Sequence, residues 1–217
     1  MMDIVPAILA HDMDSFMMRL RQAESFADCI QIDIMDGVFV PTVSFPVEEL
    51  TGVKTSLFFE VHLMVQDPFS AFPSLRNKNL KRVIFHHEAK VDHRKIIGMI
   101  QDLGMETGLA IKPETNIEDF RDLVQYLDAL LFLTVDPCCY GNPFKPEVLE
   151  KIPDARMLFP NTIIGVDGGV SLENLPSFFR LGVDYVSVGS RIFLEGNPGE
   201  NYRQFVMKAK ELERQRA

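Results

Sequence analysis

Side chains able to do chemistry lie at the ends of short apolar segments. In IQIDIMDGVFVPTVSF, from Ile30 to Phe45, alternation places Gln31, Asp33 and Met35 on one face of a predicted strand and the isoleucines on the other. Asp36-Gly37 then breaks the alternation. A carboxylate and an amide on one strand face, just before a turn, can serve proton transfer or metal ligation.

Other predicted strands end in the same way. Their final positions hold Ala7, Asp33, His62, His86, Lys112, Asp136, Asp167 and Gly189-Ser190. One polar residue at a strand end usually caps or turns the strand, but several at corresponding positions indicate a shared site. The Lys112 amine could supply a positive charge or form a Schiff base, although a solvated loop lysine before Pro113 is the simpler interpretation.

Short β-rich runs alternate with amphipathic runs along the chain. We predict strands at Ile4–Leu9, Cys29–Ile34, Leu57–Leu63, Arg82–His86, Glu106–Ile111, Ala129–Val135, Thr162–Val166 and Tyr185–Val188. Helices are predicted at residues 12–26, 93–105, 116–127 and 172–182. Eight such alternations are typical of a (β/α)8 TIM barrel, whose chemistry lies at the carboxyl ends of its strands. A doubly wound open sheet is the alternative, but VDGGV is not its G-x-G-x-x-G fingerprint.

Composition sets further limits. The chain has 217 residues and shows no linker or low-complexity tract, so we predict one domain over residues 1–217. A formal net charge of −9 argues against nucleic-acid or anionic-membrane partners, and no apolar run is long enough to span a bilayer. The amino terminus lacks a basic secretory n-region, and the three cysteines fit reduced thiols. These features predict a cytoplasmic protein.

Eight motifs together resemble a known family. In chain order they are VPAILA, IDIMDGVFVP, VHLMVQDP, IFHHEA, GLAIKPET, TVDPCCYGNPFKPEVLEKI, VDGGVSLENL and VSVGSRIF. They resemble the strand segments of the ribulose-phosphate 3-epimerase family over nearly the whole chain. The resemblance implies a TIM barrel that epimerises a phosphorylated ketose at C3, and a homodimer or larger homo-oligomer.

The resemblance also implies roles for individual residues. Asp33 and Asp167 would be the proton-transferring pair, one acting as base while the other acts as acid. Together with His62 and a second-strand histidine they would hold a divalent metal ion (Zn, Fe, Mn or Mg). The expected substrate-binding residues are Ala7, Met35, His62, Met64, Gly141, Asn142, Gly168, Gly169, Gly189 and Ser190, with the glycine loops on the phosphate.

The chain departs from the family pattern at several of these positions. Gln31 occupies the place of the metal-binding histidine, and an amide oxygen is a weaker ligand than imidazole. Gln31 could still complete a site that prefers Mg²⁺ or Mn²⁺, or the site could be empty. Ala7 replaces a serine, Lys112 an asparagine, and the loop with Cys138-Cys139 is bulkier than usual. Adjacent cysteines alone are a weak metal or redox signal.

Three functions are therefore compatible with the sequence. The first is a sugar-phosphate 3-epimerase that uses two aspartates. The second is a relative that uses Lys112 for aldolase or isomerase chemistry. The third is a non-catalytic protein that binds a sugar phosphate. Asp33 and Asp167 favour catalysis, because a binding protein has no need of two opposed carboxylates.

Overall fold

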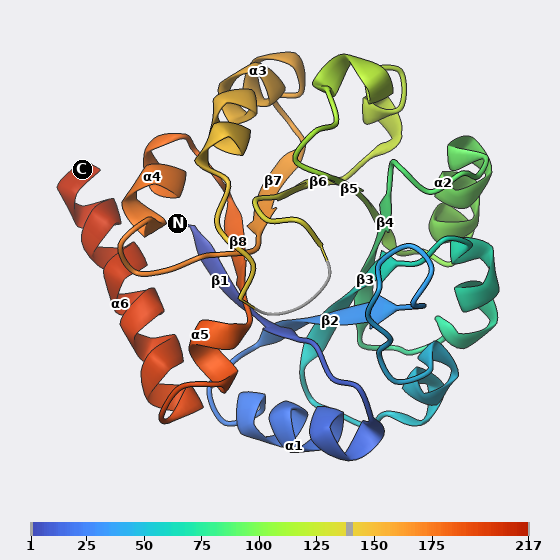
Figure 1. Cartoon of the computed structure of the whole chain (residues 1–217), viewed down its shortest axis with the longest axis horizontal. Helices are drawn as coiled ribbons and strands as arrows, with labels where there is room; N and C mark the ends of the chain where they lie inside the picture. Colours follow the sequence, from blue (N-terminus) through green and yellow to red (C-terminus); the bar gives the residue numbers. More distant parts are fainter. Residues whose placement is uncertain (1, 138–140, 217) are drawn as a thin grey trace.

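A computed structural model describes residues 2–137 and 141–216, and its centre is a closed barrel of eight parallel strands (Figure 1). The strands are β1 (Asp3–Ile8), β2 (Cys29–Met35), β3 (Phe58–Met64), β4 (Leu80–His86), β5 (Glu106–Ile111), β6 (Ala129–Leu133), β7 (Ile163–Asp167) and β8 (Tyr185–Val188). Each strand pairs with its neighbours in chain order, and β8 pairs with β1. The predicted single-domain (β/α)8 barrel is confirmed.

Helices form a ring outside the barrel (Figure 1). They are α1 (Met13–Ala23), α2 (His93–Asp102), α3 (Lys151–Leu158), α4 (Leu175–Arg180), α5 (Ser190–Phe193) and α6 (Pro198–Arg216). Short 3₁₀ segments complete the ring: η1 (Val47–Gly52), η2 (Pro68–Ser74), η3 (Ile117–Phe120), η4 (Val124–Tyr126) and η5 (Pro146–Glu150). α1 starts where the Asp12 carboxylate accepts the Ser15 backbone N–H at 2.7 Å.

The prediction of one helix over residues 116–127 was wrong. Its apolar residues have helical spacing, but the segment forms η3 and η4 with turns between them. The Asp119 side chain accepts the Asn116 backbone N–H, and the following bonds run from residue i+3 to residue i, as from Leu123 N–H to Phe120 O. Such short, tight turns still bury Phe120 and Val124 against the barrel.

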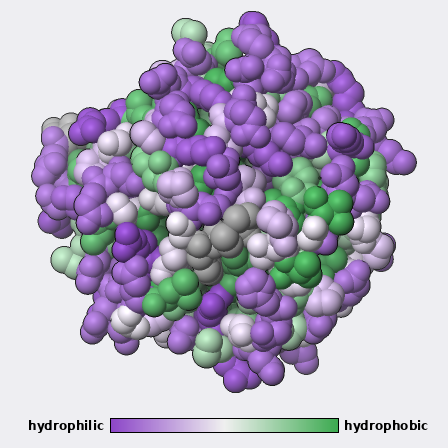
Figure 2. Space-filling view, viewed as in Figure 1, coloured by the Kyte–Doolittle hydropathy of each residue, from purple (hydrophilic) through white to green (hydrophobic). Residues whose placement is uncertain are grey.

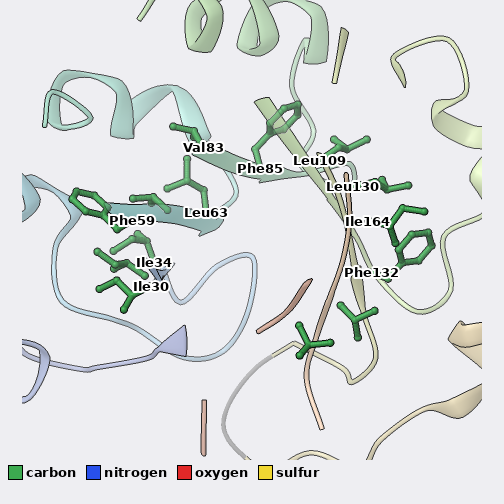
Figure 3. Packing of buried hydrophobic residues seen from close by; sticks show 14 of the residues in the cluster. Ile30, Ile34, Phe59, Leu63, Val83, Phe85, Leu109, Leu130, Phe132 and Ile164 are labelled. Atoms are coloured by element: carbon green, nitrogen blue, oxygen red, sulfur yellow. The ribbon is translucent and has the colours of Figure 1, made fainter. Parts of the chain in front are cut away.

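The strands separate an apolar outer layer from a mixed interior. Ile30, Ile32 and Ile34 of β2 belong to the main apolar cluster between strands and helices. Figure 3 shows Ile30 and Ile34 beside further members of this cluster from β3 to β7. Gln31 and Asp33 alternate with the isoleucines and therefore face the barrel interior, as predicted.

The surface is mainly polar. Hydrophilic residues dominate the face seen in Figure 2, with hydrophobic residues in small groups between them. Among the described residues, no helix is long and apolar enough to cross a membrane.

Gly165 of β7 gives a test of the packing inside the barrel. A Cβ at this position would lie 2.3 Å from the ring of buried Tyr185 on β8. We expect Gly165→Ala to lower the free energy of unfolding by about 1–3 kcal/mol, because the ring has to shift in a close-packed interior. Chemical denaturation measures this change.

Gly98 supplies the control, since it lies within α2 and a Cβ there would meet nothing within 4 Å. Gly98→Ala is expected to stabilise the protein by about 0.5–1 kcal/mol. Equal effects of the two substitutions would contradict the close contact between Gly165 and Tyr185.

Candidate active site

Three side chains from separate strands meet inside the carboxyl end of the barrel. Asp33 on β2 pairs in register with His62 on β3, and Asp167 ends β7. The Nδ1 atom of His62 lies 3.2 Å from an Asp33 oxygen and 3.5 Å from an Asp167 oxygen. One ligand atom from each of the three residues lies within 4.8 Å of the others. The structure thus brings together the two aspartates and the histidine singled out in the sequence.

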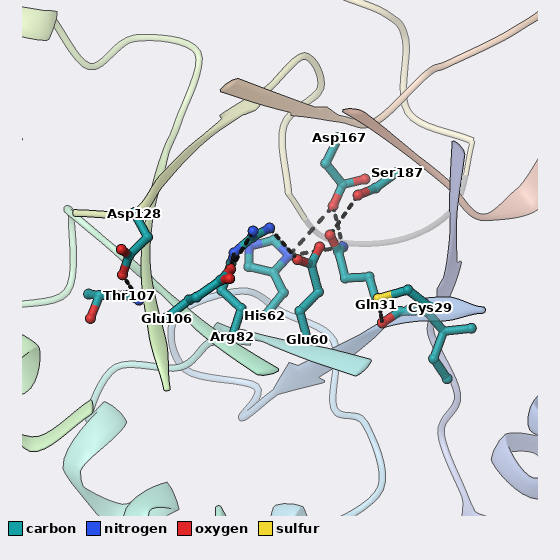
Figure 4. Close-up of polar contacts among 11 residues, drawn as sticks. Cys29, Gln31, Glu60, His62, Arg82, Glu106, Thr107, Asp128, Asp167 and Ser187 are labelled. Carbon is teal, nitrogen blue, oxygen red and sulfur yellow. Dashed lines mark hydrogen bonds and ion pairs between the residues drawn. The ribbon is translucent and has the colours of Figure 1, made fainter. Parts of the chain in front are cut away.

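Gln31 joins this group through the nitrogen of its side-chain amide. Nε2 lies 2.7 Å from Asp33 Oδ1 and 2.7 Å from Asp167 Oδ2, so the two N–H bonds are directed to the two carboxylates. The Oε1 atom accepts the Ser187 hydroxyl at 2.7 Å from β8. Figure 4 shows the Gln31 amide joined by dashed lines to Asp167 and to Ser187, with His62 nearby. The amide therefore bridges the two carboxylates.

Burial and charge set the proton affinities in the group. Burial raises the pKa of Asp33, the neighbouring Asp167 charge adds to this rise, and hydrogen bonds from His62 and Gln31 oppose it. For His62, burial acts to lower the pKa, but hydrogen bonds and charges from Asp167 and Asp33 outweigh it and raise the pKa to about 9. These contacts therefore favour the protonated form of His62 beside the two carboxyl groups.

A second histidine connects the group to the loop after β4. The Nε2 atoms of His62 and His86 are 3.0 Å apart, and His86 Nδ1 lies 3.0 Å from Glu88 Oε2. Burial lowers the pKa of His86 to about 4, so neutral His86 accepts from His62 and donates to Glu88. His86 is absent from the three-residue ligand group. Its role is to fix the orientation of His62.

Glu88 anchors the far end of this chain and predicts a pH dependence. It also accepts hydrogen bonds from the Lys112 backbone N–H at 2.8 Å and from the Thr115 hydroxyl. Burial acts to raise the pKa of Glu88, but these bonds and that from His86 lower it from 4.5 to about 2. A lowered carboxyl pKa stabilises the fold above the unfolded value, and this stability is lost as the pH falls from about 4.5 towards 2.

We therefore expect Glu88→Gln to lower the free energy of unfolding by about 2 kcal/mol at neutral pH, because an amide cannot accept every one of these bonds. The difference from the unsubstituted protein should shrink as the pH falls towards the folded pKa of about 2. Urea denaturation at a series of pH values measures it. A difference that is constant from neutral to acid pH would refute this role of the Glu88 charge.

The predicted pocket residues of β1, β2 and β3 are buried near the group. Ala7 lies opposite Gln31 in the pairing of β1 with β2 and is 2% exposed. Met35 and Met64 pack with Leu9 and Val40 in a small apolar cluster. This side of the group is therefore apolar.

Lys112 follows β5 and has a different environment. Its Nζ lies 4.1 Å from the centre of the Phe39 ring, and the Phe39 ring lies 4.7 Å from the His86 ring. The amine therefore contacts an aromatic face.

The predicted phosphate loops line an open cavity of about 540 Å³ beside the group. Five of the predicted residues line it: Gly141, Asn142, Gly168, Gly169 and Ser190. Gly189 lies just before α5 and is not among the lining residues. Gly168 and Gly169 have φ of 101° and 61°, and a Cβ on Gly168 would lie 2.5 Å from Val135. This turn therefore needs glycine at both positions.

The structure also adds residues that the sequence analysis missed. Ser187 contacts Gln31, Thr134 donates its hydroxyl to the Gly168 carbonyl at 2.5 Å, and Ser171 and Asn174 line the cavity. Ser187 could have been found, because strand alternation places it on the interior face two residues before Gly189. Cys138 and Cys139 lie outside the described residues.

The donor set suits a divalent cation, with one difference from the predicted geometry. Two carboxylates and an imidazole are ligands for zinc, iron or manganese. Gln31 was predicted as a further ligand through its oxygen, but it presents its nitrogen to the centre. Asp33, His62 and Asp167 can hold an ion, and Gln31 can join them only after its amide turns.

Comparison with known proteins decides the family. Residues 3–193 match the model of the "Ribulose-phosphate 3 epimerase family". The chain belongs to this family. A ribulose-phosphate 3-epimerase of Schizosaccharomyces pombe is 32% identical, with 96% of this chain and 95% of that protein covered. One from Chlamydia pneumoniae is 32% identical over 87% of this chain and 86% of its own. A cytoplasmic isoform from Oryza sativa subsp. japonica is 31% identical over 91% of this chain and 90% of its own.

Solved structures of more distant proteins share the barrel of this epimerase-family member. Orotidine 5'-monophosphate decarboxylase from Sulfolobus solfataricus superimposes with a TM-score of 0.67 at 13% identity, over 98% of this chain and 99% of that one. Phosphoribosyl anthranilate isomerase from Thermococcus kodakaraensis superimposes with a TM-score of 0.68 at 12% identity, over 97% of this chain and 99% of that one. These likenesses concern the fold alone.

Proposed function

We propose that this protein interconverts ribulose 5-phosphate and xylulose 5-phosphate by epimerisation at C3. The relatives of similar length are named ribulose-phosphate 3-epimerases. The observation that carries the proposal is the convergence of Asp33 and Asp167, from β2 and β7, on one point of the barrel interior. Epimerisation needs a proton to leave one face of a carbon and return to the other, which two carboxyl groups can accomplish.

Each aspartate takes one side of the proton transfer in this proposal. The carboxylate on one face removes the C3 proton, and the carboxylic acid on the other face returns one. The raised pKa of Asp33 suits it to carry the proton at rest. The His62 imidazolium, held by His86, lies beside both groups and can stabilise the negative charge of an enediolate. Met35 and Met64 keep water from the intermediate.

The cavity beside Asp167 is proposed to hold the phosphate. Gly168-Gly169 and Ser190 line it, and loops of this type bind phosphate through backbone N–H groups. Gly168 directly follows Asp167, so a phosphate held at this turn would fix the sugar relative to the carboxylate. Gly141 and Asn142 also line it.

A bound divalent cation would be held by Asp33, Asp167 and, once it has lost its proton, His62, with Gln31 as a fourth ligand if its oxygen turned inward. Zinc, iron, manganese or magnesium would stabilise the developing enediolate charge. We further propose that the protein acts in the cytoplasm, as the name of the rice relative suggests. Homo-oligomerisation stays a prediction.

Incubation with ribulose 5-phosphate in D₂O tests the proposed function. We expect xylulose 5-phosphate to form and to carry deuterium at C3, which NMR detects. Unphosphorylated ribulose should react far more slowly. Failure to exchange C3 of any pentulose or hexulose phosphate would reject the epimerase proposal and leave a sugar-phosphate-binding protein.

Borohydride trapping tests the lysine alternative. Because the Lys112 amine lies over the Phe39 ring, we expect no covalent adduct with an active ketose phosphate, and full mass spectrometric recovery of the unmodified chain. An adduct that Lys112→Arg removes would instead assign carbonyl chemistry to this lysine.

A further inference from the structure

The Gln31 amide occupies the place where the ligand atoms of the site converge. Its Nε2 is 2.7 Å from an oxygen of each carboxylate and 3.4 Å from His62 Nδ1. An amide nitrogen has two N–H donors and no lone pair that a metal could use. In this orientation Gln31 therefore satisfies the carboxylates and cannot ligate an ion between them.

The contacts of the amide show why this orientation is favoured. Gln31 and Ser187 are both buried, at 0% and 1% exposed, so each polar atom needs a protein partner. With the nitrogen inward, two carboxylate oxygens receive donors and Oε1 receives the Ser187 hydroxyl. A turned amide would place Oε1 against both carboxylates, a contact between acceptors that is unfavourable unless a proton or a cation lies between them.

Ser187 allows the Gln31 amide to turn when an ion binds between the carboxylates. A hydroxyl can donate or accept, so Ser187 can donate to Oε1 or accept from Nε2. The outer end of the amide thus has a partner in either orientation. At the inner end, Nε2 can donate to Asp33 and Asp167 directly, whereas Oε1 needs a positively charged partner between them.

We propose that Gln31 is a neutral bridge that holds Asp33 and Asp167 together in place of a metal ion, and that it weakens divalent-metal binding because an ion must first turn the amide. This inference deepens the proposed function, on which it rests for the catalytic role of the two aspartates. Their spacing, in this chain, is maintained by a hydrogen-bonded side chain, with Ser187 as its positioning residue.

Metal titration of chelator-treated protein tests the proposal without measuring activity. Isothermal titration with Mn²⁺ and with Zn²⁺ should show weak binding to the unsubstituted protein. Gln31→His, which removes the inward N–H donors and adds an imidazole, should bind each ion about 100-fold more tightly. The double variant Gln31→His with Asp33→Asn should lose this gain, which shows that the ion binds between the carboxylates.

Gln31→Leu tests the bridge itself. It leaves the carboxylates without their shared donor, so the metal-free variant should have a lower melting temperature than the unsubstituted protein. Mn²⁺ or Zn²⁺ should raise the melting temperature of the leucine variant more than that of the unsubstituted protein. A leucine variant as stable as the unsubstituted protein without metal would refute bridging.

Equal metal affinity of the unsubstituted protein and Gln31→His would refute the weakening of metal binding. Neither result depends on turnover. If the metal titrations agree with the proposal and C3 exchange is absent, the proposed function fails and the bridge stands. If C3 exchange occurs but the metal titrations disagree with the proposal, the bridge is rejected and the proposed function stands.

Discussion

Asp33→Asn and Asp167→Asn are each expected to lower kcat for C3 epimerisation by about 1,000-fold or more, near the upper part of the range for general acid–base catalysis. Asparagine keeps the size of the side chain but cannot accept the substrate proton. Both aspartates accept a hydrogen bond from Gln31, and the oxygen of an asparagine amide in the same space can still accept it. Steady-state kinetics in both directions of the reaction provide the measurement.

Asp136→Asn is the matched control. Asp136 follows β6 in the sequence, as Asp167 ends β7, but its carboxylate is exposed and pairs with Lys145 at 2.5 Å. We expect the kcat of Asp136→Asn to stay within about threefold of that of the unsubstituted protein, since a surface ion pair contributes little to the stability of the fold. Equal losses at Asp136 and Asp167 would show that the assay reports damage to the barrel mouth.

Gly169→Val is expected to lower kcat/KM for the phosphorylated substrate by about 100-fold, the scale of a 1 Å misplacement of bound substrate. Gly169 has φ of 61°, and a Cβ there would lie 2.9 Å from Phe144 Cβ. The turn must move, and the wall of the cavity with it. The rate with unphosphorylated ribulose should change much less. The ratio of the two rates measures the contribution of the phosphate.

Gly182→Val separates backbone strain from loss of the phosphate site. Gly182 has φ of 73°, but a Cβ there would meet nothing within 4 Å, and it lies outside the cavity. This variant should be destabilised and keep the preference for the phosphorylated substrate. An equal loss of preference in both variants would argue against the proposed phosphate position.

Strand alternation was sufficient to predict the interior of the barrel. The polar residues of β2 alternate with isoleucines, and this pattern alone places Gln31 and Asp33 on the inner face. The strand ends were less certain, because Met35, Met64 and Asp167 lie within strands that were predicted to stop one residue earlier. Apolar runs continue smoothly into the mouth of the barrel, so composition does not mark the last paired residue.

The orientation of Gln31 could not be predicted from its own neighbourhood. It depends on Ser187 and Asp167, which are 156 and 136 residues away in the chain. The position of the Lys112 amine likewise depends on the Phe39 ring from the loop after β2. Periodicity gives the face on which a side chain lies. Its hydrogen-bond partners follow from the closure of the barrel.

Isotope exchange in the two aspartate variants tests the two-carboxylate account most directly. If each aspartate serves one face of C3, Asp33→Asn in D₂O should exchange the C3 hydrogen of only one of the two epimers, and Asp167→Asn that of only the other. Neither variant should interconvert the epimers at an appreciable rate. Exchange of the same epimer by both variants, or of both epimers by either one, would contradict the assignment.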